Sequence, residues 1–430
     1  MRQIDKYLAD FIKFFLKYKT IRVYTGFSLL GSISLSFYGA LYPLFLEHNG
    51  IDYYEMGIIF AIMPISMFLF EIPTGILGDI IGRKNCLVLN AGISFVSKLL
   101  LVLFPQFVII ILCEILSAIS LTFATGNLQA WLIDNSKKDG LDKPMIFYTS
   151  TLQTLSIIGI SVGLFLAGLL GTFNLIYPMI VGTILSFFTF CYTILFLFDN
   201  YEKKHVKSFI DLLKKMKSQF IYSVIFTKRN TPTLYVFIIA FFVGFGTVSP
   251  FMSHWQQYFS TEFHYSPYNI GILSSSMTVL SFFILLLLPF FANKLKEEIL
   301  LSIVVAFSGF FLITLSIFKN YYYNAILFLL AFLFHKTIYS ISASIINREV
   351  DSDNRATILS TFSQCFTLGT FSGSLFCGFL CKFLSLKNIW IFCSISFLIG
   401  AVIAIIVLLK AKINSHIRFV TRKVHQDCFK

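Results

Sequence analysis

The sequence predicts an all-α membrane protein whose twelve transmembrane helices form two pseudo-symmetric six-helix bundles. Three observations predict this fold class. Of the 430 residues, 57% are hydrophobic and only 13% are charged, whereas roughly a quarter of the residues in soluble domains are charged. The apolar residues come in blocks of about 20, the length that crosses a bilayer core about 30 Å thick. The two halves of the chain also resemble one another in sequence.

The apolar blocks give the expected spans, which are joined mostly by short polar segments. They are 21–46, 54–78, 86–104, 107–134, 145–171, 174–198, 233–258, 268–291, 299–318, 323–347, 356–381 and 388–409. Most of the 34 Lys and Arg residues fall in alternate connecting segments and in the two terminal segments. Because basic residues stay on the cytoplasmic side, we expect a multi-pass protein of the cell membrane with both termini in the cytoplasm.

The formal net charge of +13 follows from this topology. Basic segments between apolar blocks contact lipid headgroups, so we expect membrane lipid as a partner and no nucleic acid. The expected domains are a cytoplasmic amphipathic N-terminus, a first bundle, a basic cytoplasmic linker, a second bundle and a basic cytoplasmic tail. Their bounds are 1–20, 21–198, 199–232, 233–409 and 410–430.

The second bundle repeats the first at a nearly constant offset. Residues 54–58 (Tyr-Glu-Met-Gly-Ile) recur 214 positions later as 268–272 (Tyr-Asn-Ile-Gly-Ile). In span 5, three glycines recur 210 positions later in span 11: Gly159, Gly163 and Gly168 as Gly369, Gly373 and Gly378. Such duplication lets two bundles enclose a site at the membrane midplane. At the 214 offset Asp79 falls on Asn293, so we expect the second copy to have lost its charges.

Residues 70–84, which close span 2, combine regularly spaced small residues with an acid and a basic pair. Glycines stand at 75, 78 and 82, an acid at Asp79, and bases at Arg83 and Lys84. This stretch resembles the signature of the major facilitator superfamily between helices 2 and 3, Gly-x-Leu-x-Asp-x-x-Gly-Arg-Lys. The preceding Glu-Ile-Pro-Thr-Gly resembles the drug-efflux-like branch of that superfamily.

The resemblance implies a gate at the cytoplasmic mouth. In the family, the Asp of this loop approaches the start of helix 11 and the Arg meets an acid at the end of helix 4, here Asp134. The segment 355–360 (Arg-Ala-Thr-Ile-Leu-Ser) is similar to the start of helix 11 in the efflux-like branch. Alternatively, these charges only terminate helices. The expected gate residues are Gly75, Asp79, Gly82, Arg83, Lys84, Asp134, Arg348 and Arg355.

Ionisable side chains inside a membrane are costly and are therefore functional candidates. Glu114 in span 4 and Lys98 in span 3 stand at similar depth and are expected to face one another across a hairpin if the rotations of the two helices agree. They form either a structural ion pair or a site where Glu114 couples transport to protons. Glu71, near the end of span 2, is a second candidate for proton coupling or an acceptor for nearby hydroxyls. His335 in span 10 is a third.

The resemblance also implies that helices 1, 4, 7 and 10 line a central cavity. Candidates for its wall are His335 and Lys336 in span 10, Tyr38 and Tyr42 in span 1, and His254 and Trp255 in span 7. The alternatives are polar residues satisfied between packed helices, and aromatic anchors at the membrane interface.

The sequence lacks the motifs of metal-binding, disulfide-rich and ATP-driven proteins. The eight cysteines have no His at metal-site spacing, so no metal and no disulfide framework is expected. No Gly-x-x-x-x-Gly-Lys-Ser/Thr occurs, so ATP is not the expected energy source, and no cofactor or enzymatic activity is predicted.

These observations and the resemblance together imply a monomeric secondary transporter that moves a small molecule by alternating access. The first hypothesis is proton-driven efflux, by antiport, of a drug-like, toxic or peptide-derived compound, as in antibiotic resistance. Span 5 lacks the Gly-Pro-x-x-x-Gly-Gly pattern typical of proton-antiporting exporters, so proton-coupled uptake of a nutrient is the alternative. A non-transporting sensor or assembly factor on the same fold is a second alternative.

Overall fold

The computed structural model describes residues 17–139, 145–198, 225–292, 294–318 and 320–427, with Phe15, Ile221 and Ser223. The chain divides into two compact units. The first comprises Met1–Phe209 and Gln256–Phe282, and the second comprises Ile210–Trp255 and Phe283–Lys430. Most of the expected N-terminal segment and linker lies outside the described residues, as do the side chains of most of the tail. The expected domain boundaries therefore stay a prediction.

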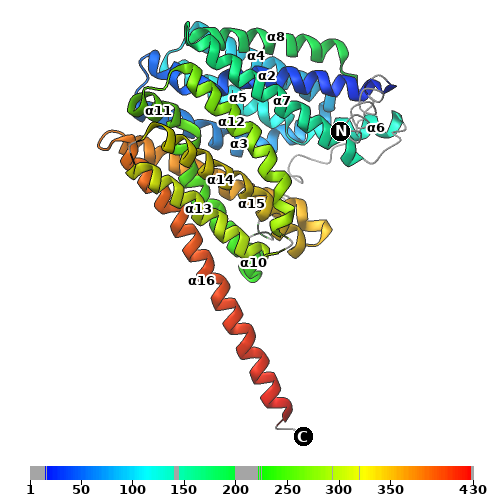
Figure 1. The fold of residues 1–430 in the computed structure, drawn as a ribbon. Coiled ribbons are helices and arrows are strands. Elements are labelled where there is room, and N and C mark those ends of the chain that lie inside the picture. The colour runs from blue at the N-terminus through cyan, green and yellow to red at the C-terminus, as the bar shows by residue number, and fades with distance from the viewer. Residues whose placement is uncertain are drawn as a thin grey trace, which may run out of the picture. The chain divides into compact units, whose positions relative to one another are not determined.

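The first unit is built from helices that run nearly the full length of the expected spans (Figure 1). They are α2 (Lys19–His48), α3 (Tyr53–Ile81), α4 (Arg83–Leu103), α5 (Phe107–Ala124), α6 (Asn127–Asp139), α7 (Met145–Gly171) and α8 (Ile176–Phe196), with most of α11 (Trp255–Phe263) and the first part of α12 (Pro267–Ala292). The second unit contains the rest of α12 and the remaining helices. They are α10 (Thr231–Thr247), the π-helix η1 (Val248–Ser253), α13 (Glu297–Ile317), α14 (Tyr321–Glu349), α15 (Ser352–Leu380) and α16 (Leu386–Asp427).

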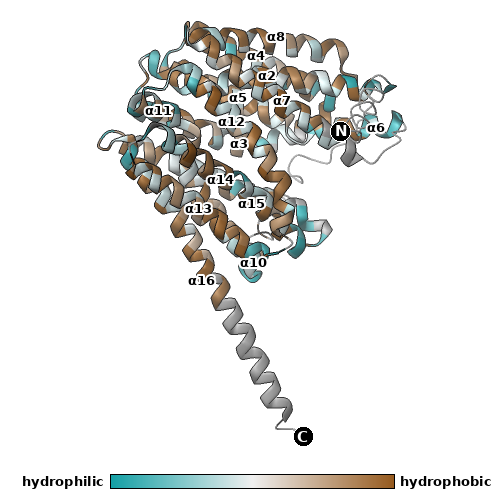
Figure 2. Cartoon of the chain, in the orientation of Figure 1, coloured by the Kyte–Doolittle hydropathy of each residue, from teal (hydrophilic) through white to brown (hydrophobic). Residues whose placement is uncertain are grey.

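The fold class expected from the sequence is confirmed. Among the described residues, eleven helices are long and apolar enough to cross a membrane. The expected span 356–381 corresponds to α15, a further 29-residue helix. Hydrophobic residues follow the helices, and hydrophilic residues gather at ends and connections such as α6 (Figure 2). Two of the spans are broken: span 4 into α5 and α6, and span 7 into α10, η1 and α11.

Both units pack their helices in the same order. In the first unit α2 lies against α7 and α8, and α4 lies against α5 and α8. In the second unit α10 lies against α15 and α16, and α13 against α14 and α16. The repeated glycines of spans 5 and 11 explain part of this match. A Cβ on Gly163 would meet the Ser36 hydroxyl of α2, and one on Gly373 would meet the Phe245 carbonyl of α10. Only glycine permits these close crossings.

Local sequence fixes where several helices begin and end. Asp52 accepts a hydrogen bond from the Glu55 amide at 2.7 Å, and the Glu55 carboxylate accepts one from the Asp52 amide at 3.1 Å, which starts α3. This is a capping box, which satisfies amides that the first helical turn leaves unpaired. Gly82 separates α3 from α4 with φ +87° and ψ 159°, a conformation that is essentially restricted to glycine. Gly126, with φ +75°, stands at the break between α5 and α6.

Candidate functional site

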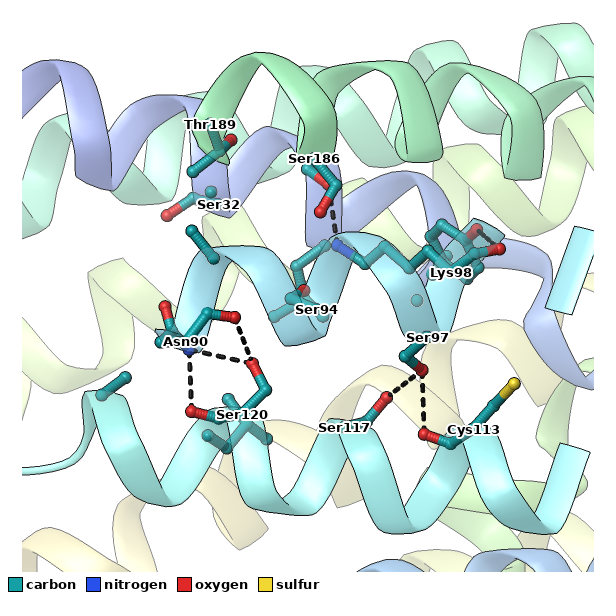
Figure 3. Close-up of a pocket in the computed structure, with 18 of the residues that line it drawn as sticks. Ser32, Asn90, Ser94, Ser97, Lys98, Cys113, Ser117, Ser120, Ser186 and Thr189 are labelled. Atoms are coloured by element: carbon teal, nitrogen blue, oxygen red, sulfur yellow. Dashed lines mark hydrogen bonds between the residues drawn. The ribbon is translucent and has the colours of Figure 1, made fainter. Parts of the chain in front are cut away.

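A cavity of about 520 Å³ lies inside the first unit, among α2, α3, α4, α5, α7 and α8 (Figure 3). Its polar lining comes from hydroxyl groups, one amide and two charged side chains. They are Tyr24, Ser28, Ser32, Ser34, Tyr38, Tyr42, Asn90, Ser94, Ser97, Lys98, Glu114, Ser117, Ser120, Ser156, Ser186 and Thr189. The volume and mixed lining are those of a site for a small organic molecule. The sequence-predicted residues Tyr38, Tyr42 and Glu114 all contribute to it.

Glu114 of α5 is half-buried in this lining and is held by one tyrosine. The Tyr42 hydroxyl donates to Glu114 Oε1 at 2.6 Å, the length of a hydrogen bond to an ionised carboxylate. The Tyr42 ring is itself fixed edge-on against Phe60 of α3, with ring centroids 5.9 Å apart. Three helices therefore hold the carboxyl group at the cavity wall, where it can bind and release a proton.

Lys98 of α4 has a different partner from the one expected. Its ammonium donates to Ser34 Oγ at 2.8 Å and lies 5.4 Å from the centre of the Tyr38 ring. Glu114 is bonded to Tyr42 instead, so the expected Lys98–Glu114 ion pair is not formed in the described part of the chain. The expectation was wrong because equal distance from the hairpin turn fixes depth but not rotation, and the two side chains leave their helices in different directions.

Hydrogen bonds of polar side chains join α4 to α5 along the cavity (Figure 3). Ser97 Oγ donates to the Cys113 carbonyl at 2.8 Å and is 2.9 Å from Ser117 Oγ. One turn or more away, the Asn90 amide donates to the Ser120 carbonyl at 2.8 Å, and the Ser120 hydroxyl donates back to the Asn90 carbonyl at 2.8 Å. These bonds fix the register of the two helices and turn the polar face of α4 toward the cavity.

The expected gate residues of the first unit stand around the turn between α3 and α4. Arg83 Nε lies 2.9 Å from Asp134 Oδ2, so the first residue of α4 is paired with the end of the broken span 4. Gly82 makes the turn, and Lys84 follows in the first turn of α4. Gly75 has open space around it in the described structure. The side chain of Asp79, and with it the expected contact to helix 11, lies outside the described residues.

The second unit carries a charged cluster where the sequence was expected to have lost its charges. Arg348, at the end of α14, pairs with Glu297 at 2.9 Å, with Glu349 at 3.1 Å, and also with Glu298. Glu297 and Glu298 form the first turn of α13. The expectation is therefore corrected: the second copy lacks the acid that aligns with Asp79 but keeps a charged contact between corresponding helix ends.

This second contact has the opposite polarity. Three charged residues of the first unit have charge-reversed counterparts 214 positions later: Arg83 and Glu297, Lys84 and Glu298, Asp134 and Arg348. A comparison of residue identities misses this exchange because none of the three is conserved between the copies. A comparison of charge at the offset already found would have shown it.

Arg355, near the start of α15, binds backbone carbonyl groups. Its guanidinium donates to the carbonyl groups of Asn347 and Val350, at 3.2 and 3.4 Å. These carbonyls belong to the end of α14, where a helix leaves acceptors unpaired and where its dipole favours a cation. Arg355 therefore fastens the turn between α14 and α15.

The remaining candidates for proton coupling and cavity lining do not line the cavity of the first unit. Glu71 is exposed, and the nearby Thr74 hydroxyl donates to the backbone carbonyls of Phe70 and Glu71, not to the carboxylate. His335 stacks on Phe251 with ring centroids 4.9 Å apart, and its Nδ1 has no hydrogen-bond partner in the described structure. Lys336 Nζ lies 4.9 Å from the centre of the Phe332 ring. Neither residue lines the first-unit cavity.

His254 and Trp255 also fall outside that cavity, so they do not share a wall with Tyr38 and Tyr42 there. Both are buried in or beside the break that follows η1. His254 Nδ1 is 2.5 Å from Ser253 Oγ, and the Trp255 ring packs on Phe328 with centroids 5.4 Å apart. A π-helix often marks a functional irregularity in a span, but the pattern of apolar residues does not reveal one.

No group of three or more His, Cys, Asp or Glu side chains that could hold a metal ion occurs in the part of the chain that the structure describes. The seven cysteines described there are free thiols. The polar groups that the cavity offers are hydroxyl groups, one amide, one ammonium and one carboxyl group.

Known proteins are similar to this chain in sequence or in fold. The chain is 24% identical over 280 residues to "Multidrug resistance protein 2" of Bacillus subtilis (strain 168), covering 63% of this chain and 67% of that one. It is 24% identical over 302 residues to "Sucrose permease" of Escherichia coli, covering 66% and 68%. Among solved structures, the nucleoside transporter NupG superposes with a TM-score of 0.73 at 14% identity, covering 91% of this chain and 99% of that one.

The family comparison covers most of the chain. The model of the Major Facilitator Superfamily matches residues 25–335 and 255–423. The matched stretch includes the duplicated bundles, the turn at Gly82 and the cavity around Glu114. The chain therefore belongs to the Major Facilitator Superfamily and is a membrane transporter of that type.

Proposed function

We propose that this transporter couples the movement of a small, hydroxyl-bearing organic solute to protons, and that Glu114 carries the proton. The observation that supports this most is the placement of Glu114 in the wall of a solute-sized cavity, bonded to Tyr42 at 2.6 Å. A carboxyl group inside a membrane span is costly and persists where it has a function. Loss or gain of a proton there changes the charge of the cavity without moving any helix.

We rank the two directions of transport by the class of solute that the polar groups of the lining can bind. Serine hydroxyls from five helices and the Asn90 amide give the mainly apolar cavity a set of polar groups that can bind a hydroxyl-bearing solute. We therefore place proton-coupled uptake first, in agreement with the likeness to a sucrose permease. Proton-driven efflux of a toxic compound, with a role in antibiotic resistance, is the second candidate. It is favoured by the Glu-Ile-Pro-Thr-Gly segment and by the likeness to a multidrug resistance protein.

The charged contacts at the helix ends serve as the cytoplasmic gate in this proposal. The Arg83–Asp134 pair and the Arg348 cluster each join two helix ends within one unit. Partly exposed ion pairs contribute about 1 kcal/mol or less each, which suits contacts that are made and broken in every cycle. The proposal further places the chain in the cell membrane as a monomer, with both termini in the cytoplasm.

The test uses purified full-length protein in proteoliposomes, with sucrose, uridine, sorbitol and gluconate as polar solutes and ethidium as the drug probe. We expect an inward proton gradient to drive accumulation of at least one polar solute, and E114Q to remove the dependence on the gradient. E262Q is the matched control because Glu262 is exposed on α11. Failure of every solute to move faster than in protein-free vesicles would refute the proposal.

A second measurement separates the two directions in cells that express the chain. A protonophore collapses the proton gradient, so it lowers the cell content of a solute that is taken up and raises the content of one that is exported. Higher ethidium content after protonophore treatment, lost in E114Q but kept in E262Q, would favour export over uptake.

A further inference from the structure

The ammonium of Lys98 has no carboxylate partner in the described structure and faces the cavity. Its hydrogen bond goes to Ser34 Oγ at 2.8 Å, and the Ser34 hydroxyl itself donates to the Gly182 carbonyl at 2.8 Å. An ammonium has three N–H donors, so this one bond leaves donors to spare. Glu114, the acidic residue of the cavity lining, accepts a hydrogen bond from Tyr42 and not from Lys98.

Three hydroxyl groups from three helices line the same cavity without a hydrogen bond to protein in the described structure. They belong to Ser32 of α2, Ser94 of α4 and Ser186 of α8. Ser94 and Lys98 are four residues apart on α4 and therefore lie on the same face of the helix. In Figure 3 the Lys98 side chain extends toward α8, where Ser186 points into the cavity. Buried polar groups normally have partners, so these donors are available to a bound molecule.

We propose that Lys98, Ser94 and Ser186 bind the anionic group of the transported solute, so that the substrate is a hydroxylated organic anion. An ammonium with neighbouring hydroxyl donors matches the oxygen atoms of a carboxylate or phosphate. This inference rests on the proposed function, because it names the solute that the same cavity carries.

The two charges of the cavity then act together. With Glu114 ionised, Lys98 and Glu114 leave the cavity without net charge. With Glu114 protonated, Lys98 is the remaining charge, and an anion is held more strongly. Because linkage is reciprocal, a bound anion strengthens proton binding to the same degree. Proton and anion therefore travel in the same direction.

Lys98 could instead serve only to hold α4 against α2 through Ser34, and one variant distinguishes the two roles. K98Q removes the charge and keeps a side chain of similar length. K294Q removes the same charge at the exposed turn before α13 and is the matched control.

The experiment measures binding to the purified full-length protein, without a proton gradient, by the shift in thermal unfolding. The probes are matched pairs: gluconate with sorbitol, glycerol 3-phosphate with glycerol, and 4-hydroxybenzoate with 4-hydroxybenzyl alcohol. We expect at least one anion to bind and its uncharged counterpart to bind about tenfold or more weakly. K98Q should lose about the same factor for the anion and should bind the uncharged counterpart like the wild type, whereas K294Q should retain the binding of both within a few fold.

Three results would overturn the inference: no anion binds, a neutral counterpart binds as well as its anion, or K98Q binds the anion like the wild type. Equal losses of the anion and of its uncharged counterpart in K98Q would also overturn it by showing a structural role. None of these results depends on proton coupling. Failure of the proposed function appears separately, as a bound anion that a proton gradient does not move.

Discussion

Reversal of the Arg83–Asp134 pair tests whether this ion pair holds the turn between α3 and α4 closed. The pair is 2.9 Å long, and its side chains are 25% and 48% exposed. At that exposure an ion pair contributes up to about 1 kcal/mol, and two like charges at similar distance in water repel by about 1 kcal/mol. Replacing attraction by repulsion therefore changes the local free energy by up to about 2 kcal/mol, or about 30-fold in an opening equilibrium.

The native thiol of Cys86 reports this opening. It is buried in the first turn of α4, 3.4 Å from where a Cβ on Gly78 would stand. Maleimide reaction at Cys86, followed by peptide mass spectrometry, measures how often the turn opens. We expect R83E and D134R each to speed the reaction by up to about 30-fold. The double variant R83E/D134R restores attraction with the polarity of the second unit, and its reaction should return close to the wild-type rate.

The control is K294E, which reverses a charge at an exposed turn of the second unit. Its reaction rate should match the wild type. Single variants that react no faster than the wild type would show that the pair does not hold the turn. A double variant that reacts as fast as the single ones would show that the effect comes from each helix end alone and not from their attraction.

Two further variants test the backbone arrangement. Gly82→Ala should lower stability by about 1–3 kcal/mol because φ +87° with ψ 159° is strained for any residue with a Cβ; thermal unfolding checks this, and an unchanged midpoint would contradict the turn. Gly168→Ala should lower stability by about 1–3 kcal/mol because its Cβ would lie 2.6 Å from the Gly271 Cα of α12. Gly31→Ala, with open space around the glycine, is the matched control, and equal midpoints for both variants would contradict the close α7–α12 crossing.

The helices were predictable from the sequence because a membrane span needs a long apolar block, and such blocks stand out against polar connections. The irregularities inside them were not. Gly126 breaks span 4, and η1 at Val248–Ser253 breaks the regular helix of span 7. Polar residues do interrupt the apolar blocks there, as in Thr125-Gly126-Asn127 and Ser249-Pro250, but the mean hydropathy of a whole span averages over such short interruptions. Helix type within a span depends on packing, which hydropathy does not report.

The candidate site was predictable in part. Tyr38 and Tyr42 were expected at a central cavity and line the cavity of the first unit, as does Glu114, which was expected as a proton-coupling residue; Lys98 was noted as a charge inside a span. The hydroxyl lining was missed, although Asn90, Ser94 and Lys98 recur every four residues and so mark one face of α4. The partner of Lys98 was not predictable because the rotation of a helix about its axis is set by its neighbours.

The reversal of charge between corresponding residues of the two units could have been predicted from the sequence. The offset of 214 that aligns residue 54 with 268 also aligns Arg83 with Glu297 and Asp134 with Arg348. Duplicated halves can keep a contact while reversing its sign, because attraction depends on the product of the charges. A search for conserved residue types alone passes over such a pair.

Proton flux driven by a solute gradient tests the role of Glu114 most directly. Proteoliposomes that enclose a pH-sensitive dye receive a gradient of a solute that the wild type moves, with no initial pH difference. The account predicts that protons follow the solute in the wild type and in E262Q, and that E114Q moves the solute with little or no proton flux. Proton flux of wild-type size in E114Q would contradict the account.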